Sequence, residues 1–581
     1  MASNARRSRT HNQSPAWNHR PPDPANSLAS RATESAQSKP QLGALRELWS
    51  DPLSGPAIVV YLAVLKLLLH FYFSAFSNYG LFYDELERIA DSKHLDWGYV
   101  DDGPLTVWMG WLSRALMGES VFSLRFFPAI AGALTIVLAG LMARELGGGR
   151  FAQGLAALAV LIAPVYLGSQ NMFCPPASEP VWWGLCAYLV IRIIKTGNTR
   201  LWVWFGVIVG LGFLNKLSML FLGAAVTVCL LLTPERQYLF NRWAVIGGLA
   251  ALVIASPYIL WQIPHDWATV QYLAQAKRRA TANVPSWIFF GGQITYLHPV
   301  NFPIWLAGLG WFLVAKDARS FRVLGWAYLL ILGFLLVTKS QIYYFTPVYP
   351  FLLAGGGVAV ERWVNQRTPP GEGTRPTGGR FCGGCRPGAL TRRWLKRGLP
   401  AVLVAGGLVA APMMLPVLPI EKTDAYVAAV TAGVLGNTFL ITFPFHGAQG
   451  WEKLAKVVAE VFHRLSPEEQ ADCIIFAGNY GEAGAIDYYG PALGLPPATA
   501  FHMNYYFWGP PAKSGKVSIY VGLDRDALER SFGEVQQVAT FEAPDHVFFV
   551  EDHVPIYICR KPRFDLKEIW PKLKERAFLN Y

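Results

Sequence analysis

Long apolar runs recur along the chain, and they constrain its fold more than any other feature. A membrane-spanning helix needs about 20 predominantly apolar residues, and about eleven segments approach this length and composition. They lie at residues 56–76, 121–143, 151–168, 177–195, 201–215, 217–233, 243–263, 303–316, 322–338, 344–361 and 400–418. A further apolar segment, 105–118, is short and carries Arg114, which favours a helix lying along the membrane interface. The pattern predicts a polytopic α-helical membrane protein.

The amino-acid composition supports a membrane protein and argues against nucleic-acid binding. Of 581 residues, 52% are hydrophobic and 15% are charged, and the mean hydropathy is +0.27. A soluble protein of this size would not have that balance. The formal net charge of +12 would suit a nucleic-acid-binding protein, but Lys and Arg fall mainly between the apolar runs and in the N-terminal tail. We therefore exclude nucleic acid as a partner and expect a membrane instead.

The basic residues also orient the predicted spans. Cytoplasmic loops of membrane proteins carry an excess of Lys and Arg. If the N-terminal tail is cytoplasmic, the alternate loops on that side contain Arg144 and Arg150; Arg192, Lys195 and Arg200; Arg236 and Arg242; Lys316, Arg319 and Arg322; and the basic segment 362–399. Since every basic loop falls on one side, we predict a multi-pass protein with a cytoplasmic N-terminus.

Four regions follow from these patterns. Residues 1–50 are polar, lack an apolar core and predict a disordered cytoplasmic tail. Residues 51–419 contain the predicted spans, with 362–399 as a basic cytoplasmic loop. In residues 420–581 a helical pattern at 451–470 is followed by short β-type runs, which predicts a small α/β domain. The order of the spans places that domain outside the cytoplasm.

The outer face collects charged and aromatic residues from distant parts of the sequence. The set comprises Asp84, Glu85, His94, Asp101 and Asp102 after the first predicted span, Glu179 at the mouth of the fourth, His265 after the seventh, Lys277, Arg278 and Arg279 in the following loop, and Lys339, Tyr343 and Tyr344 before the tenth. A carboxylate can deprotonate a hydroxyl, and cations can stabilise a phosphate leaving group. These residue types on one membrane face predict glycosyl transfer from a lipid-phosphate donor.

Each of these residues also has a structural interpretation. Asp84 and Glu85 fit the N-cap and first turn of a loop helix equally well. A single histidine such as His265 is more often an interfacial residue than a metal ligand. The run 277–279 suits either a solvated segment or a contact with lipid headgroups. Glu179 favours function, because acids within otherwise apolar spans are costly.

Several motifs resemble one known family in their order and spacing. FYDELERIADSKHLDWGYVDDGPL (82–105) and SLRFFPAIAGALTIVLAGLMAREL (123–146) are similar to the first outer loop and second span of bacterial glycosyltransferase family 39-like proteins. This family is related to the protein O-mannosyltransferases and the lipid A aminoarabinose transferases. GLGFLNKLSMLFLG (210–223), KSQIYYFTPVYPFLLAGGG (339–357) and NYGEAGAIDYYGP (479–491) resemble later blocks of the same family.

The resemblance implies a GT-C fold and an inverting transferase of the bacterial inner membrane. Its donor would be a polyprenyl-phosphate sugar, its acceptor a protein, lipid or glycan, and its C-terminal domain would be periplasmic. Asp84 takes the place of the family's base, and Lys339 that of a lysine near the donor phosphate. Glu179 stands where relatives often have Asp. His265 falls where some relatives have a metal-binding histidine, so the resemblance allows a divalent metal as cofactor.

One motif departs from the family. Many relatives read Tyr-Val-Asp-His-Pro-Pro-Leu where this chain reads YVDDGPL, so that Asp102 replaces His and Gly103 replaces Pro. The departure points to a different donor or acceptor. Two other functions stay open, a transporter or flippase of lipid-linked sugars and a non-catalytic relative that binds polyprenyl lipid. A transporter would need polar residues deep in several spans and repeat symmetry, whereas the polar residues here gather at one face.

Overall fold

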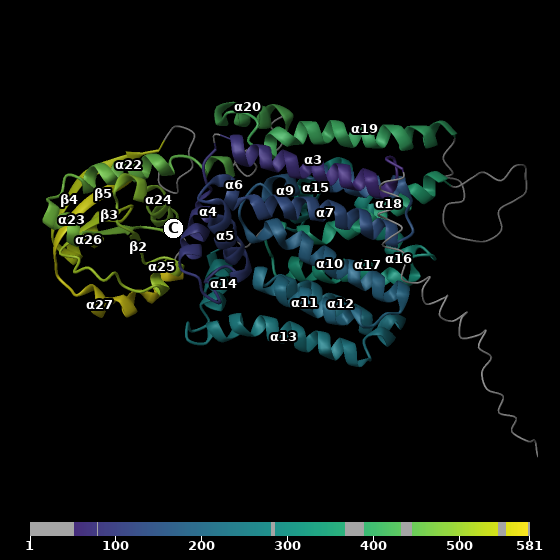
Figure 1. The fold of residues 1–581 in the computed structure, drawn as a ribbon, viewed down its shortest axis with the longest axis horizontal. Coiled ribbons are helices and arrows are strands. Elements are labelled where there is room, and N and C mark those ends of the chain that lie inside the picture. The colour runs from purple at the N-terminus through teal and green to yellow at the C-terminus, as the bar shows by residue number, and fades with distance from the viewer. Residues whose placement is uncertain are drawn as a thin grey trace, which may run out of the picture.

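The computed structural model describes residues 51–77, 79–279, 285–365, 389–431, 444–543 and 553–578. The predicted tail 1–50 and the middle of the predicted loop 362–399 lie outside these residues. The described ends of that loop are helical, because α18 extends to Asn365 and α19 begins at Ala389. Figure 1 shows an elongated molecule with a helical body and, at one end, a smaller part that contains a β-sheet.

The body is almost entirely helical. Its α-helices are α3 (Gly55–Phe76), α4 (Tyr83–Lys93), α5 (Pro104–Met117), α6 (Val121–Leu124), α7 (Phe126–Glu145), α8 (Arg150–Ile162), α9 (Pro164–Ser169), α10 (Pro175–Thr196), α11 (Leu201–Asn215), α12 (Met219–Leu231), α13 (Arg242–Gln262), α14 (Ala268–Arg279), α15 (Ser286–Leu297), α16 (Phe302–Val314), α17 (Arg322–Val337), α18 (Tyr349–Asn365), α19 (Ala389–Met414) and α20 (Ile420–Val430). Short 3-10 helices are η1 (Pro234–Tyr238), η2 (Pro299–Asn301), η3 (Arg319–Phe321) and η4 (Ile342–Val348).

The helices agree with the predicted spans in position. Each predicted apolar segment coincides with one helix or with two consecutive ones. Among the described residues, 6 helices are long and apolar enough to cross a membrane, or 7 if the pair Ser286–Leu297 and Pro299–Val314, bent by 96°, is one span. The helices Arg150–Ile162, Leu201–Asn215 and Met219–Leu231 are apolar but shorter. The polytopic helical class is confirmed, and the count of about eleven spans stays a prediction.

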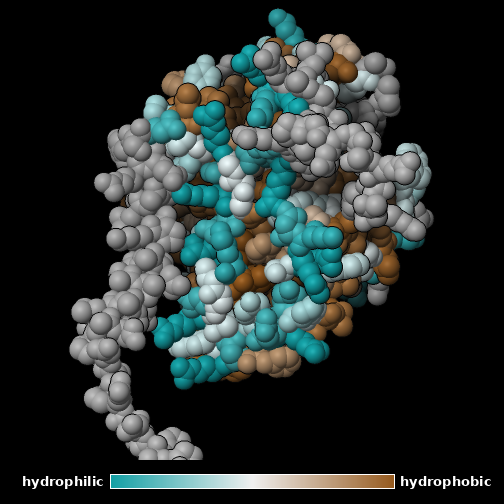
Figure 2. Space-filling view, turned by 90° about the vertical axis from the view of Figure 1, so that its right-hand side faces the viewer, coloured by the Kyte–Doolittle hydropathy of each residue, from teal (hydrophilic) through white to brown (hydrophobic). Residues whose placement is uncertain are grey.

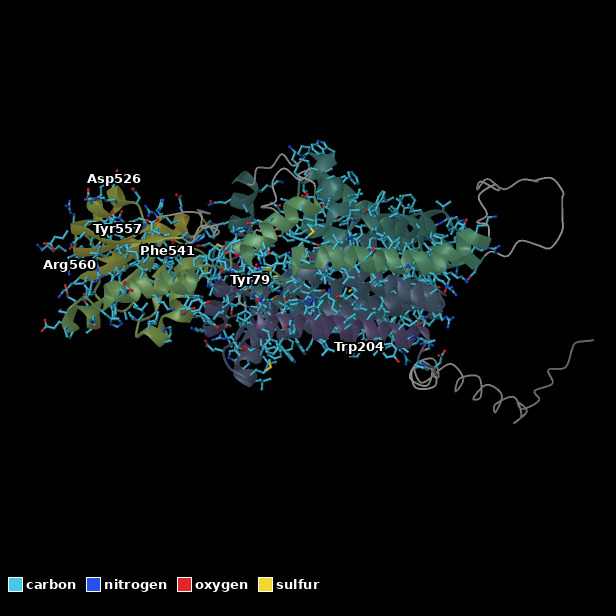
Figure 3. The ribbon with its side chains drawn as sticks, turned by 90° about the horizontal axis from the view of Figure 1, so that it is seen from above. Tyr79, Trp204, Asp526, Phe541, Tyr557 and Arg560 are labelled. Carbon is cyan, nitrogen blue, oxygen red and sulfur yellow. The ribbon has the colours of Figure 1, made fainter. Side chains whose placement is uncertain are left out.

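The flanks and ends of the body differ in polarity, as expected of a protein in a bilayer. Large apolar side chains such as Trp204 and Leu252 are exposed on the flanks, and Figure 3 shows Trp204 at the edge of the body. Figure 2 shows hydrophilic side chains gathered at the end opposite the sheet. Arg144 and Lys195 lie in the last turns of α7 and α10. These observations support lipid contact along the flanks.

Helix α4 forms in the outer loop because its own side chains complete its first turn. The Glu85 side chain accepts a hydrogen bond of 2.9 Å from the backbone N–H of Phe82, the residue before the helix. Leu86 and Ile89 are buried in one apolar core with Trp451 and Ile486 of the sheet-containing part. The loop helix therefore packs against both parts of the molecule.

The C-terminal part combines helices with a five-stranded sheet, and α20, which precedes it in the chain, packs on α19. Its strands are β1 (Ile474–Ala477), β2 (Ala498–Ala500), β3 (Val517–Val521), β4 (Phe532–Glu542) and β5 (His553–Pro562), in the order β2-β1-β3-β5-β4. Its helices are α22 (Trp451–Phe462), α23 (Pro467–Asp472), α24 (Tyr480–Tyr489), η5 (Pro491–Leu493), α25 (Asn504–Phe507), α26 (Arg525–Ser531), α27 (Leu566–Ile569) and η6 (Trp570–Phe578). Strand β1 pairs in parallel with β2 and β3, and β5 is antiparallel to β3 and β4. We call residues 451–578 the sheet domain. The predicted domain boundary at residue 420 stays a prediction.

Candidate active site

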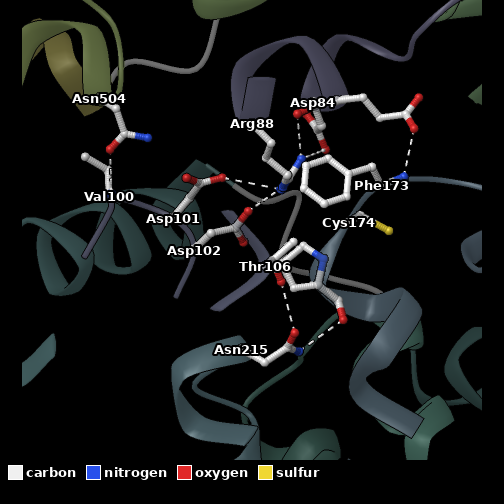
Figure 4. Close-up of polar contacts among 12 residues, drawn as sticks. Asp84, Arg88, Val100, Asp101, Asp102, Thr106, Phe173, Cys174, Asn215 and Asn504 are labelled. Atoms are coloured by element: carbon white, nitrogen blue, oxygen red, sulfur yellow. Dashed lines mark hydrogen bonds and ion pairs between the residues drawn. The ribbon is translucent and has the colours of Figure 1, made fainter. Parts of the chain in front are cut away.

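Three carboxylates surround one arginine between α4 and α5 (Figure 4). Arg88 Nε donates to Asp102 Oδ2 at 2.5 Å, and the Arg88 Nη atoms lie 3.8 Å from Asp84 Oδ2 and Asp101 Oδ2. Asp84 and Arg88 meet because residues four apart share one face of a helix. We call these four residues the acid cluster. Since one guanidinium faces three carboxyl groups, the cluster has more acids than one cation can neutralise.

Neighbouring acids on α4 increase this imbalance. Glu87 and Asp91 are buried, and burial with repulsion from Asp101 raises the pKa of both well above the ordinary range. Burial and the adjacent Asp102 raise the pKa of Asp101 to about 8. At neutral pH the cluster therefore holds protons as well as charges.

Asp84 is the most accessible acid of the cluster. Its side chain is 34% exposed, compared with 15% for Asp101 and 8% for Asp102. Its Oδ1 accepts a hydrogen bond of 2.9 Å from the Tyr480 hydroxyl. Burial raises the pKa of Asp84, while Arg88 and the Tyr480 hydrogen bond oppose the rise. An accessible carboxylate with a raised pKa is suited to take a proton from a hydroxyl group.

Glu85, the next residue, is fully enclosed. Its Oε1 accepts hydrogen bonds from Arg125 Nε at 2.9 Å and from the Phe173 N–H at 2.7 Å. Its Oε2 accepts from Arg125 Nη2 at 2.6 Å and from the Phe82 N–H at 2.9 Å. Burial opposes ionisation, but Arg125 and the backbone donors outweigh it and lower the pKa of Glu85. Its oxygens are engaged in holding the loop together, so its environment favours a structural role over a catalytic one.

A second group of charged residues lies at the short connection between the end of α11 and the start of α12. Lys216 follows the last residue of α11 in an extended conformation. Its Nζ lies 3.5 Å from Glu179 Oε2 and 4.7 Å from the ring centroids of Tyr343 and Tyr344. Among the residues that the structure describes, no atom accepts a hydrogen bond from this buried ammonium group. We call Lys216, Glu179, Tyr343 and Tyr344 the lysine cluster.

Helix α10 places Glu179 at this point. The helix begins at Pro175 with a second proline at the next position, which suits a first turn because proline needs no N–H partner there. Glu179 lies one turn further and is buried. Ser218, just after Lys216, donates a hydrogen bond to Glu179 Oε1. The connection between α11 and α12 thus contributes both Lys216 and the Ser218 hydroxyl that holds Glu179.

The acid cluster and the lysine cluster are brought together where the loop at Gly103 packs on the end of α11. A Cβ atom on Gly103 would lie 2.0 Å from the carbonyl oxygen of Leu214, so this loop passes directly over the end of α11. Thr106 Oγ1 also donates to Asn215 Oδ1 at 2.9 Å (Figure 4). The Gly103 departure from the family pattern therefore has a packing reason. The loop that carries Asp101 and Asp102 is seated beside Lys216.

Helix α14 adds Tyr272 at the same junction. Figure 1 shows α14 beside α5, between the body and the sheet domain. Burial raises the pKa of Tyr272, and the charges of Asp101, Glu87 and Asp84 raise it further. The tyrosine therefore faces the acidic side of the site.

The predicted cations lie further out. Lys277 is exposed in the last turn of α14, and Arg278 and Arg279 belong to the same helix, although their side chains are outside the description. Lys339 is exposed just after α17, with a positive φ of 50°. The assignment of these cations to the donor phosphate stays a prediction.

The two histidines predicted for the site, His94 and His265, each stack on a tryptophan ring. His94 caps the far end of α4, about 15 Å from Asp84 by the helical rise, and its ring stacks on Trp508 with centroids 4.0 Å apart. His265 stacks on Trp261 at 3.9 Å, and its Nδ1 lies 2.7 Å from the Trp261 carbonyl oxygen. In the described ranges no three His, Cys, Asp or Glu residues are grouped to hold a metal ion. These surroundings do not fit a metal site at His265.

Three residues of the site were not singled out from the sequence. Lys216 lies within the motif 210–223. It could have been found from the sequence as a cation on the membrane face where positive charge is disfavoured. Arg88 follows Asp84 by four residues, the spacing of a helical ion pair. Tyr480 has no local signal, because its contact depends on how the sheet domain docks.

Comparisons with known proteins agree with this architecture. Residues 101–261 match the family model described as dolichyl-phosphate-mannose-protein mannosyltransferase. The structure of ArnT from Cupriavidus metallidurans in the apo state superposes with a TM-score of 0.55 over 86% of this chain and 97% of that chain, at 16% sequence identity. These matches confirm the predicted resemblance to the GT-C glycosyltransferases. The ArnT structure bound to undecaprenyl phosphate gives a TM-score of 0.54 at the same identity and coverage.

Several curated relatives match in sequence, and two of them represent the set. Lipid A galacturonosyltransferase RgtD of Rhizobium johnstonii is 25% identical over 224 residues, which cover 38% of this chain and 46% of the relative. The undecaprenyl phosphate-alpha-4-amino-4-deoxy-L-arabinose arabinosyl transferase of Pseudomonas aeruginosa is 27% identical over 210 residues, 33% of this chain and 38% of the relative. The alignments thus span less than half the length of these relatives.

Proposed function

We propose that the chain is an integral-membrane glycosyltransferase that moves a sugar from a polyprenyl phosphate to an acceptor on the outer side of the membrane. One observation carries the proposal, namely that the loop at Gly103 seats the acid cluster beside the lysine cluster. The first cluster offers an accessible carboxylate, and the second offers an ammonium group for which the described part of the chain supplies no hydrogen-bond acceptor. The names of the curated relatives support a lipid-linked donor.

Asp84 acts as the base. It accepts the proton of the acceptor hydroxyl, whose oxygen attacks the anomeric carbon of the sugar. The bond between that carbon and the phosphate oxygen breaks, and its electron pair leaves with the polyprenyl phosphate. Because attack and departure occur on opposite faces of the carbon, the anomeric configuration inverts.

Lys216 holds the donor phosphate. A phosphate oxygen would complete the hydrogen bonding of Nζ and would receive charge stabilisation as the leaving group forms. Glu179, whose Oε2 lies 3.5 Å from Nζ, orients the ammonium group. Tyr343 and Tyr344 confine it through their ring faces. The more exposed Lys339 and the 277–279 run serve to attract the anionic donor.

The loop acids and the enclosed Glu85 support this chemistry indirectly. Asp101 and Asp102 hold Arg88 beside Asp84, and Glu85 anchors the turn that presents Asp84. The remaining topology follows the sequence analysis, with about eleven spans, a cytoplasmic N-terminus and a periplasmic sheet domain. Lipid A is one acceptor class to test, because one curated relative is named for it, and both hexosyl and pentosyl donors belong in the panel.

The test is a single-turnover assay of purified protein with a panel of undecaprenyl-phosphate sugars, in which release of undecaprenyl phosphate is measured. The panel contains 4-amino-4-deoxy-arabinose, galacturonic acid, mannose and glucose donors, each with and without lipid A. Wild type is compared with Asp84→Asn and with Asp526→Asn, a matched change at an exposed acid of the sheet domain (Figure 3). We expect release by wild type and Asp526→Asn only.

Two results would contradict the proposal. Release by Asp84→Asn at the wild-type rate would remove Asp84 from the chemistry. Donor binding without release in any combination, acceptor included, would favour a transporter or a lipid-binding protein. Movement of labelled donor across vesicle bilayers would then separate these two alternatives.

A further inference from the structure

The sheet domain reaches into the site through Tyr480. Strand β1 ends at Ala477, and α24 begins three residues later with Tyr480 as its first residue, capped by the Asn479 side chain. Residues that follow parallel strands gather at one edge of a sheet, which is where open α/β sheets bind ligands. Here that edge faces α4. His502, which follows the neighbouring parallel strand β2, packs its ring 5.1 Å from the ring of Tyr480.

The contact between Tyr480 and Asp84 is direct and partly buried. The Tyr480 hydroxyl donates to Asp84 Oδ1 at 2.9 Å, which is the hydrogen bond that the described residues supply to this carboxylate. Arg88 Nη1 lies 3.8 Å from the other oxygen, Oδ2. Tyr480 therefore occupies one oxygen of Asp84 and leaves the second for an acceptor hydroxyl.

Close packing fixes the two helices in this position. A Cβ atom on Gly484 of α24 would lie 2.9 Å from the backbone of Leu86 on α4, so the helices touch at that glycine. At the far end of α4, Lys93 Nζ donates to the Asp487 carbonyl at 2.8 Å. The loop that leads to the acid cluster is held as well, since the Val100 N–H donates to Asn504 Oδ1 at 2.8 Å (Figure 4).

We infer that Tyr480 is a positioning residue for Asp84, so that the active site is complete only when the sheet domain is docked on α4. The inference rests on the proposed function and names a part of the same site that lies outside the membrane body. The hydroxyl orients the Asp84 carboxylate and stabilises its ionised form through a charge-assisted hydrogen bond. Loss of this bond makes Asp84 harder to ionise.

The charged and titratable groups around Asp84 define what the test must separate. From α4 these are Tyr83, Glu85, Glu87 and Arg88; from the loop before α5, Asp101 and Asp102; from α24, Tyr480; and from α14, Tyr272. All of these except Tyr480 remain in a Tyr480→Phe variant. A change in the pH dependence of that variant therefore reports the lost hydroxyl.

The experiment measures kcat and kcat/KM against pH for wild type, Tyr480→Phe and Tyr488→Phe. Tyr488 is a partly buried residue of the same helix and makes no hydrogen bond to Asp84 among the described residues, so it controls for the loss of a tyrosine hydroxyl from α24. For Tyr480→Phe we expect kcat to fall about tenfold to 100-fold, the usual effect of removing a hydrogen bond to a charged group. The acid limb of the profile should move to higher pH, because more base is needed to ionise Asp84. Tyr488→Phe should match wild type.

A fluorinated tyrosine at position 480 provides a second variant that keeps the ring and the hydroxyl. Fluorine makes the hydroxyl a stronger donor, so the acid limb should move to lower pH, opposite to the shift in Tyr480→Phe. If wild type is active and both variants keep its pH profile, the inference is overturned while the proposed function stands. If wild type releases no polyprenyl phosphate with any donor, the proposed function fails and the inference fails with it.

Discussion

The two sides of the first turn of α4 carry similar charges but pair them differently. On one side, Glu85 is fully buried, and Arg125 and two backbone N–H groups satisfy both of its oxygens. On the other side, Asp84 is partly exposed and shares Arg88 with two further acids, and the described residues give its carboxylate one hydrogen bond. A structural carboxylate therefore differs from one available for chemistry in how completely its oxygens are paired, and not in the presence of the acid.

The largest expected effect is that of Asp84→Asn on turnover. The amide keeps the size of the side chain but cannot accept the hydroxyl proton. Loss of a general base costs about 10²–10⁴-fold in rate, so kcat should fall by that factor. The dissociation constant for the donor lipid and the melting temperature in detergent should stay close to wild type. If Asp84→Asn loses donor binding together with turnover, Asp84 has a structural or binding role and is not the base.

Glu85→Gln should act on stability instead. It leaves Arg125 buried without its counter-ion, and breaking a buried ion pair costs about 3–5 kcal/mol. We expect a clear drop in melting temperature in detergent, with residual activity in the molecules that stay folded. Glu119→Gln is the matched control, because Glu119 pairs with Arg114 at the surface and such pairs contribute about 0–1 kcal/mol. An unchanged melting temperature with lost turnover would assign Glu85 a catalytic role.

Lys216→Met tests the second half of the site. Methionine keeps the apolar stem between the tyrosine rings but removes the ammonium group. Loss of a charged hydrogen bond to the phosphate should raise the dissociation constant for the donor about tenfold to 100-fold. The control is Lys195→Met, in the last turn of α10 and so at the opposite end of that helix from Glu179. This variant should bind the donor as wild type does. Equal binding by both variants would remove Lys216 from the donor site.

The smallest effect concerns Asp101 and alkaline pH. Burial and Asp102 raise the pKa of Asp101 to about 8, so this group is neutral below that pH and charged above it. Its ionisation adds negative charge beside Arg88 and near the donor phosphate, and the wild-type rate should therefore fall as pH rises through 8. Asp101→Asn stays neutral, which should keep the rate at pH 9 about threefold above wild type. Parallel rate profiles for the two proteins would contradict this assignment.

The sequence predicted the helical class, the positions of the apolar helices and the strands near the C-terminus. Those features depend on local composition and periodicity, which are visible in one chain. It could not separate Asp84 from Glu85, because Arg125, Phe173 and Tyr480 reach these neighbours from distant segments. The sequence alone also does not rank Lys339 against Lys216 as a ligand of the donor phosphate, since both cations stand at the outer ends of apolar runs.

The predicted roles of the histidines show the same limit. His94 and His265 stand in the right loops, yet each stacks on a tryptophan. Stacking of this kind depends on which rings meet in the folded chain. Residue type alone does not distinguish a packed histidine from a ligand.

The central claim is a one-step displacement in which Asp84 activates the acceptor while Lys216 holds the leaving phosphate. The measurement that tests it most directly is the anomeric configuration of the transferred sugar, determined by NMR on the product of a single turnover with whichever donor of the panel is used. We expect a product with the configuration inverted relative to the donor. A retained configuration would contradict it, because retention requires two displacements and a glycosyl intermediate that this arrangement of Asp84 and Lys216 does not provide.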